Sequence, residues 1–324
     1  FMPSTIIAGP EINAESVKTA YILTTKLLHL LERFEVAAVP VIPLKGPVLA
    51  QTLYGDTAGR VYEDLDLLVR KEDVVRATAL LGECGYQPDS GFARVPPAQW
   101  TRLTWESTFR DRNGTIVDLH WDIAPSDYPF RLEPETMLAN SVPVRIAGRD
   151  VLGLNAECLF VYLAIHGAKH AWDHKKWIPD VARLLAVNPS LDWSKVFTLA
   201  GSGGGERVVL LAALLARDLG GASLPADVGQ RIARDAVVPR LAEEVKARYA
   251  EPEPPSMSGF TYTKFNAALA VGTWDRIRHY AGLLKAPTEA DVRAVQLPAA
   301  LFWLYYPLRV TRLAAKYARR IVRT

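Results

Sequence analysis

Cysteine is scarce in this chain, since Cys84 and Cys158 are the only two among 324 residues. So few cysteines provide neither a disulfide framework nor a cysteine-based metal site, and they suit a reducing compartment. Long apolar runs are also missing: the longest, residues 297–308, contains two prolines and is too short to span a bilayer. The residues after Met2 lack the basic segment and long apolar core of a secretion signal. We therefore expect a cytoplasmic protein with no transmembrane segment.

The chain also lacks a large excess of positive or negative residues. The chain has 38 Lys and Arg against 35 Asp and Glu, a net charge of +3, which makes nucleic acid an unlikely partner. Residues 309–323 are locally basic. They could bind RNA or an anionic membrane, but we favour a solvated helix face on the surface. The aromatic residues just before them, Trp303, Tyr305 and Tyr306, are expected in the core.

Hydrophobic periodicity predicts an α+β chain. Residues 1–150 read as a mixed β-sheet flanked by helices, and residues 151–324 read as all-helical. The expected elements are a helix at 14–34, strands at 39–44 and 64–69, helices at 47–54 and 72–84, β-strands at 104–110 and 115–121, and short strands within 142–154. Asn113-Gly114 predicts a hairpin between the 104–110 and 115–121 strands. Asn155 is expected to cap the first helix of the second half.

Two aspartates lie on the strand at 64–69. Asp64 and Asp66 are two residues apart, so both project from one face of the strand, while Leu65 and Leu67 project from the other. Paired carboxylates on a buried strand are costly unless a cation neutralises them. Oxygen-only ligands favour Mg²⁺ or Mn²⁺ over zinc.

A third carboxylate follows on the 115–121 strand, where Asp118 and His120 share one face. A two-metal site for phosphoryl transfer needs such a set of carboxylates. We therefore predict that Asp64, Asp66 and Asp118 are the metal ligands and the catalytic residues. His120 either orients Asp118 or contacts substrate, or it is a half-buried strand histidine bonded to a neighbour.

Basic and flexible residues flank the first aspartate pair. Gly46 would let a triphosphate approach closely, and the helix that begins at Pro47 offers backbone N–H groups to an anion. Lys45 and Arg60 add positive charge for phosphate oxygens. Each feature alone has an ordinary structural explanation, since an Asp-x-Asp pair is common by chance. Their order along the chain is what favours a nucleotide site.

These motifs together resemble a known group. The residues are Lys45-Gly46, Tyr54-Gly55, Arg60, Asp64 to Val69, Gly85-Tyr86, Val117 to Trp121, His166, His170, Trp177, Ile178 and Asp180. The chain is similar to the uncharacterised bacterial nucleotidyltransferases of the DNA-polymerase-β-like superfamily. The resemblance implies a catalytic domain at 1–150, a helical domain at 151–324 that closes over the nucleotide, and metal-dependent nucleotidyl transfer by Asp64, Asp66 and Asp118.

The chain also departs from that superfamily. The usual Gly-Ser after the first strand is Lys45-Gly46-Pro47 here, so no hydroxyl stands beside the glycine. Lys45 is a candidate to replace it. The donor is either a nucleoside triphosphate or a nucleotide-sugar, and the acceptor is a small molecule, peptide or protein. The alternative function is a catalytically silent module that binds a nucleotide or phosphorylated ligand.

A histidine- and lysine-rich segment follows in the helical half. It contains His166, His170 and His174, and Lys169, Lys175 and Lys176. The i, i+4 spacing would place the three histidines on one helix face. A zinc site is one interpretation. The lysines favour contact with phosphate or substrate instead, through His166, Lys169, His170 and Lys176, and plain structural packing is the third possibility.

Overall fold

The computed structural model describes residues 11–89, 95–201, 204–251, 259–285, 287–295 and 297–321. The start of the chain, where we looked for a secretion signal, falls mostly outside these residues. Within them, no helix combines the length and the apolar character needed to cross a membrane.

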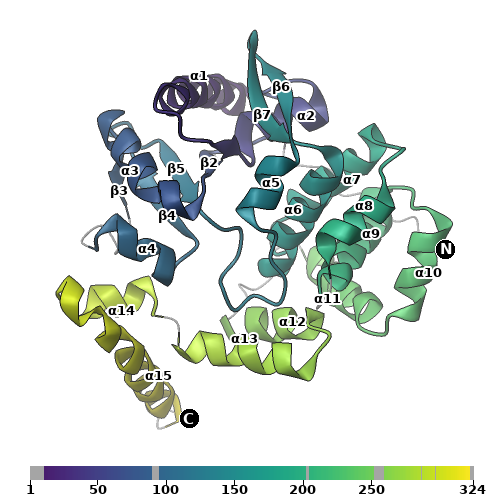
Figure 1. Ribbon diagram of the computed structural model, residues 1–324. Coiled ribbons are helices and arrows are strands. Elements are labelled where there is room, and N and C mark those ends of the chain that lie inside the picture. The colour runs from purple at the N-terminus through teal and green to yellow at the C-terminus, as the bar shows by residue number, and fades with distance from the viewer. Residues whose placement is uncertain are drawn as a thin grey trace.

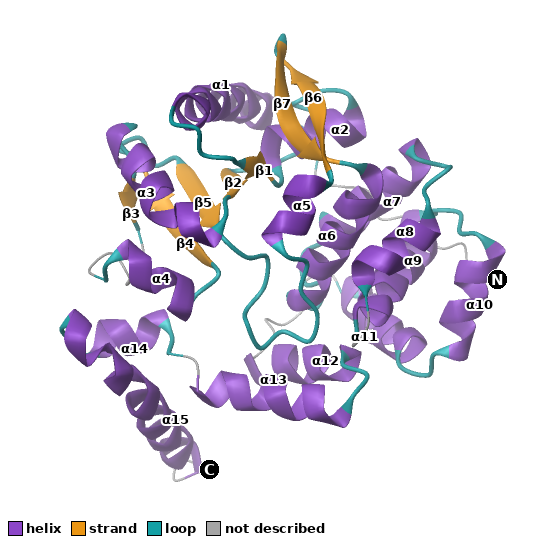
Figure 2. Ribbon diagram, in the orientation of Figure 1, coloured by secondary structure: helices purple, strands orange, loops and turns teal. Residues whose placement is uncertain are grey.

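The N-terminal half contains a five-stranded mixed sheet with strand order β1-β2-β5-β4-β3 (Figures 1 and 2). The strands are β1 (Ile42–Pro43), β2 (Asp64–Leu68), β3 (Gln87–Pro88), β4 (Glu106–Arg110) and β5 (Ile116–His120). Strands β2 and β5 are parallel, whereas the other pairs are antiparallel. This confirms the predicted mixed sheet and the β4–β5 hairpin.

The remaining elements of this half are helices and a second hairpin. They are α1 (Ala14–Val36), α2 (Gly46–Tyr54), η1 (Lys71–Asp73), α3 (Val74–Glu83), α4 (Pro97–Leu103), α5 (Pro134–Ala139), β6 (Ser141–Ile146) and β7 (Arg149–Leu154). The strand expected at 39–44 is shorter, because only two of its residues pair with β2. The helix expected at 72–84 begins as a 3₁₀ turn in η1 before α3.

One face of the sheet is apolar. Leu65, Leu67, Val117 and Leu119 are at most 1% exposed and belong to a core cluster that includes residues of α1 and α3. Alternation along each strand therefore sends the intervening polar residues to the opposite face. That face is free of α1 and α3.

The second half is helical, as predicted. Its helices are α6 (Ala156–Lys169), α7 (Trp177–Val187), α8 (Trp193–Ala200), α9 (Gly205–Gly220), α10 (Ala226–Arg234), α11 (Val238–Ala250), α12 (Gly259–Leu269), α13 (Thr273–Lys285), α14 (Glu289–Ala294), η3 (Ala299–Leu304) and α15 (Tyr305–Ile321). Asn155 caps α6 by accepting a hydrogen bond from the Cys158 backbone N–H. A second core cluster joins α6, α7 and α9 to Leu49 and Leu53 of α2. The division near residue 150 stays a prediction.

The C-terminal aromatics do not all enter the core. Tyr305 is 1% exposed, but Trp303 is 63% exposed and Tyr306 is 42% exposed, so the expectation was wrong for these two. Tyr305 is held by its hydroxyl, which bonds the Val295 carbonyl and the Leu297 N–H. In Figure 1 the yellow helices α14 and α15 lie at the edge of the molecule, away from α10 and α11.

Candidate functional site

Strand register builds a polar face from three neighbouring strands. In the parallel pair β2–β5, Asp66 lies opposite Asp118. In the antiparallel pair β4–β5, Thr108 lies opposite Asp118 and Glu106 opposite His120. Side chains of directly paired residues share a face. The resulting polar face carries Asp64, Asp66, Glu106, Thr108, Asp118 and His120.

The three aspartates converge on this polar face. One carboxylate oxygen from each of Asp64, Asp66 and Asp118 lies within 4.8 Å of the others. Asp66 is 3% exposed, and its Oδ2 has no hydrogen-bond partner among the described residues. A set of carboxylate oxygens with one buried oxygen unsatisfied suits a hard divalent cation. The residues present therefore fit Mg²⁺ or Mn²⁺.

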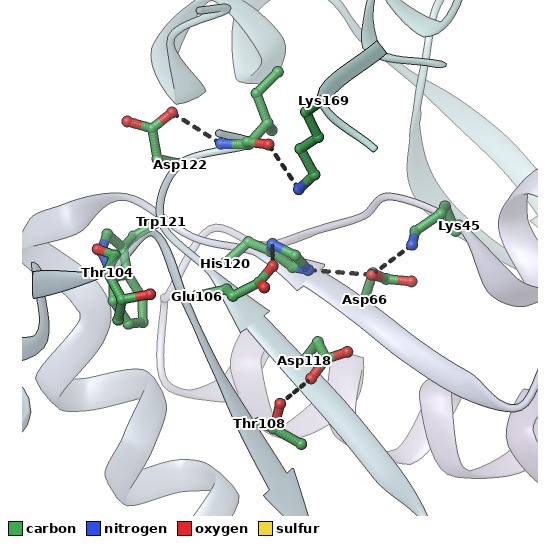
Figure 3. A network of polar contacts seen from close by, with 11 residues as sticks. Lys45, Asp66, Thr104, Glu106, Thr108, Asp118, His120, Trp121, Asp122 and Lys169 are labelled. Carbon is green, nitrogen blue, oxygen red and sulfur yellow. Dashed lines mark hydrogen bonds and ion pairs between the residues drawn. The ribbon is translucent and has the colours of Figure 1, made fainter. Parts of the chain in front are cut away.

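Lys45 lies beside Asp66 (Figure 3). Its Nζ is 2.9 Å from Asp66 Oδ1. Burial, the largest single effect, would lower the pKa of Lys45, but the charges of Asp66 and Asp64 and the hydrogen bond to Asp66 act together against it, and the pKa lies above its ordinary value. Gly46 follows with φ +59°, a left-handed conformation that suits glycine, and begins α2. The N-terminus of α2 therefore lies next to a fixed positive charge.

The carboxylates differ in their electrostatics. Burial would raise the pKa of Asp66, yet Lys45 and His120 hold it well below its usual range. Burial raises the pKa of Asp64, and Asp66 raises it further. Burial also raises the pKa of Asp118 to about 6, although the 2.6 Å hydrogen bond from Thr108 Oγ1 opposes the shift. The three carboxyls are therefore electrostatically unequal.

His120 links two carboxylates rather than orienting Asp118. Its Nε2 is 3.1 Å from Asp66 Oδ1, and its Nδ1 is 3.1 Å from Glu106 Oε2. Figure 3 shows this chain of contacts across the sheet. Glu106 and Thr108 were not among the predicted site residues. The available signal was their alternation on the strand of the hairpin that faces Asp118 and His120.

Arg60 is engaged by a buried aspartate. Its Nε lies 3.0 and 2.9 Å from the two carboxylate oxygens of Asp180, and its Nη2 is 2.9 Å from Oδ2. Tyr54 adds a hydroxyl at 3.1 Å from the same carboxylate. Arg60 is 7% exposed and therefore ties the segment before β2 to α7. Its contact with phosphate stays a prediction.

The three histidines do not share one helix, so that expectation was wrong. Helix α6 ends at Lys169, and Ala171 and Trp172 adopt positive φ angles. This turn buries the Trp172 ring against Gly167, where an added Cβ would lie 2.5 Å from the ring. The sequence spacing could not reveal this turn, because it depends on the burial of a single tryptophan.

The histidines nevertheless gather around Trp177. The ring centroids of His166, His170 and His174 lie 4.9, 5.3 and 5.4 Å from its indole. Burial lowers the pKa of His170 to about 4 and holds the pKa of His166 well below its ordinary value. At neutral pH these imidazoles are uncharged and can donate or accept hydrogen bonds.

Two lysines complete the surroundings of the carboxylates. Lys169 Nζ donates to the Ile123 carbonyl at 3.1 Å, and burial lowers its pKa (Figure 3). Burial also lowers the pKa of Lys176, while Asp64 acts in the opposite direction. Both lysines therefore contribute to the electrostatics of the site from the helical half.

Comparison with known proteins gives a family match. Residues 11–221, more than half of the chain, match the model of a family described as uncharacterised nucleotidyltransferase. No curated protein matches the chain.

Two solved structures are distantly similar. The antibiotic-resistance factor ANT(2'')-Ia is 16% identical, with a TM-score of 0.38 over 56% of this chain and 90% of that one. An antigenic nucleotidyltransferase-like protein from Paracoccidioides brasiliensis is also 16% identical, with a TM-score of 0.37 over 68% of this chain and 99% of that one.

Proposed function

This chain belongs to the uncharacterised nucleotidyltransferase family, and from that premise we propose that it transfers a nucleotidyl group to an acceptor hydroxyl with the help of a divalent cation. The observation that carries the proposal is the meeting of three carboxylates beside the N-terminus of α2. The donor is proposed to be a nucleoside triphosphate, with a nucleotide-sugar as the alternative.

The proposed cation site consists of Asp64, Asp66 and Asp118. A bound Mg²⁺ or Mn²⁺ would neutralise charge on the phosphate oxygens and on the attacking oxygen. Asp66 supports this role because it keeps a buried oxygen without a partner. Its low pKa keeps it ionised at any physiological pH.

The proposed donor site surrounds the start of α2. Backbone N–H groups at a helix N-terminus attract phosphate, and the left-handed φ of Gly46 sets the start of this helix. Lys45, on the other side of Gly46, is proposed to supply an ammonium that takes over the role of the superfamily's serine. Lys176 adds positive charge, and the histidines around Trp177 add neutral hydrogen-bonding groups where α6 leads into α7. Arg60 shares its charge with Asp180, and its contact with phosphate is part of the proposal.

The proposed chemical step is an in-line substitution at the α-phosphorus. The acceptor oxygen forms a bond to this phosphorus, and the bond to the pyrophosphate oxygen breaks, so pyrophosphate leaves with the electron pair. The acceptor proton is proposed to pass to Asp118, which lies on the polar face opposite Asp66. Thr108 occupies Asp118 Oδ1, which leaves Oδ2 to receive the proton.

The alternative is a module on the same fold that binds a nucleotide without turning it over. The missing Gly-Ser favours this alternative, whereas the retained carboxylates favour an enzyme. A nucleotide-binding module does not require a titrating third carboxylate next to the metal pair.

Binding and turnover of nucleotides can separate these functions. We expect the wild type to bind a nucleoside triphosphate in the presence of Mn²⁺, and Asp64→Asn/Asp66→Asn to lose that binding while keeping its circular dichroism spectrum. Asp118→Asn is expected to bind nucleotide but release no pyrophosphate when a panel of hydroxylated acceptors is added. Unchanged nucleotide affinity in the double variant would falsify the proposal. Tight binding without turnover of any acceptor would support the silent module.

A further inference from the structure

A cavity adjoins the polar face of the sheet. Its volume is about 560 Å³, within the range of small-molecule sites. Glu106 and Thr108 line it, and Thr108 bonds the proposed general base Asp118. The cavity therefore opens beside the carboxylate that would receive the acceptor proton.

Its outer wall comes from helices beyond the part of the chain that matches the family. Residues of α12 and α13, among them Asn266 and His279, line the cavity, whereas the family match ends at residue 221. Asn266 Nδ2 donates to the Lys169 carbonyl at 3.0 Å. His279 Nδ1 lies 2.9 Å from the Asp127 carbonyl oxygen. These contacts fix both helices against the segment between β5 and α5 and against the end of α6.

The lining has an excess of positive charge. It contains five lysine and arginine residues, of which Arg309 pairs with Asp291 outside the lining, and three aspartate and glutamate residues. Asp122 is shared by Lys71 at 3.8 Å and by Arg131, so this trio keeps one uncompensated positive charge. Lys169 adds another cation, with its Nζ 3.1 Å from the Ile123 carbonyl oxygen and 5.7 Å from the centre of the Trp105 ring. Such a lining repels polycations and attracts anions.

The wall also offers uncharged polar groups. His279 Nε2, Asn266 Oδ1, Tyr128 OH and Trp105 Nε1 are buried without a hydrogen-bond partner among the described residues. His279 is 4% exposed, and its Nδ1 already faces the carbonyl oxygen and, at 3.2 Å, the carboxylate of Asp127, so Nε2 is the ring nitrogen left for a ligand. Buried polar groups are normally satisfied, so several unpaired groups around one cavity indicate a hydroxylated ligand.

We propose that this cavity binds the acceptor, and that the acceptor is a polyhydroxylated anion such as a sugar phosphate or a sugar acid. Its anionic group lies toward Lys71 and Arg131, and a hydroxyl lies toward Asp118. The assignment of the ligand as an acceptor rests on the proposed nucleotidyl transfer, but its binding does not. Residues 259–282 then set acceptor specificity, while the family-matched residues handle the nucleotide.

Four hexoses of matched size test the charge preference. Glucose 6-phosphate, glucuronate, glucose and glucosamine are compared by saturation-transfer NMR on the full chain, without nucleotide or metal. We expect both anions to bind more tightly than glucose, and glucosamine to bind most weakly. The two anions separate a phosphate from a carboxylate preference. The proposal is overturned if glucosamine binds as tightly as the anions, or if neither anion binds up to its solubility limit.

Charge reversal at the rim locates the binding. Lys71 has a half-exposed side chain, so Lys71→Glu is expected to fold and to weaken anion binding by about fivefold or more. Arg112→Glu, at the exposed β4–β5 turn, is the matched control and is expected to change nothing. Equal effects of the two variants, or none, contradict the proposed site.

The proposed function is tested separately by Mn²⁺-dependent nucleotide affinity in Lys71→Glu, which is expected to equal that of the wild type. If the chain binds the anions but no nucleotide, the anion-binding cavity stands and the proposed nucleotidyl transfer is wrong. If the chain binds nucleotide but neither anion, the proposed nucleotidyl transfer stands and the proposed acceptor cavity is wrong.

Discussion

Substituting Lys45 by methionine tests how much its ammonium stabilises the buried carboxylate of Asp66. Lys45 Nζ lies 2.9 Å from Asp66 Oδ1, and Asp66 is 3% exposed. Removing one partner of a buried ion pair costs about 3–5 kcal/mol, because the other charge stays buried without compensation. His120 Nε2 remains 3.1 Å from the same oxygen. We therefore expect a loss near the lower end, about 3 kcal/mol, in the metal-free protein.

The assay is urea denaturation followed by circular dichroism, with and without Mn²⁺. A cation held by the carboxylates would replace the missing ammonium, so Mn²⁺ should stabilise Lys45→Met more than it stabilises the wild type. Saturation at about 100 times the dissociation constant adds about 2.7 kcal/mol. Asp66→Asn in the Lys45→Met background should return part of the lost stability without Mn²⁺, because the buried charge is then gone.

Lys18→Met, on the exposed surface of α1, is the control and should unfold like the wild type. Two results would refute the reasoning. One is a Lys45→Met variant as stable as the control without metal. The other is equal stabilisation of Lys45→Met and the wild type by Mn²⁺.

Three further predictions concern the surroundings of the carboxylates. Arg60→Leu leaves Asp180, which is 1% exposed, without its ion-pair partner, and should lower the free energy of unfolding in urea by about 3–5 kcal/mol. If the further substitution Asp180→Asn restored none of this loss, the result would count against a buried pair. Thr108→Val removes a hydrogen bond that lowers the pKa of Asp118, so this pKa should rise above about 6 in a carboxyl NMR titration, and an unchanged value would contradict the contact. The pKa of His170 is about 4 in the folded state against 6.5 ordinarily, so the unfolded state binds more protons at this residue between these values. The contribution of His170 to stability should therefore fall as pH drops from about 6.5 to 4, by about 3 kcal/mol at most, whereas the raised pKa of Asp118 acts in the opposite direction. The difference in stability between the wild type and His170→Asn should change over this pH range, and a constant difference would contradict the prediction.

Alternation along single strands predicted much of the site. Asp64, Asp66 and Asp118 were expected on polar faces of two strands, and the structure brings them together because β2 and β5 pair in parallel with Asp66 opposite Asp118. The helix that begins at Gly46 and its left-handed C-cap at Gly55 also agree with the glycine and proline positions in the sequence. Each of these features is local or needs one strand pairing.

Features that depend on the order of strands and helices could not be predicted in the same way. Glu106 joins the site only because β4 pairs with the far side of β5. Arg60 meets Asp180 across 120 residues of chain, so nothing near either residue indicates the pair. The cavity requires α13 to lie close to the loop at Asp127, where an added Cβ at Gly282 would be 2.1 Å from Asp127 Cβ.

Counting bound Mn²⁺ by electron paramagnetic resonance tests the central claim most directly. Increasing Mn²⁺ is added to the protein with a non-hydrolysable nucleoside triphosphate, and the free-ion signal is measured. The wild type should take up Mn²⁺ beyond the amount that the nucleotide binds by itself. Asp64→Asn/Asp66→Asn, folded by circular dichroism, should show no such uptake. Equal uptake by the two proteins would contradict the assignment of these carboxylates as the cation site.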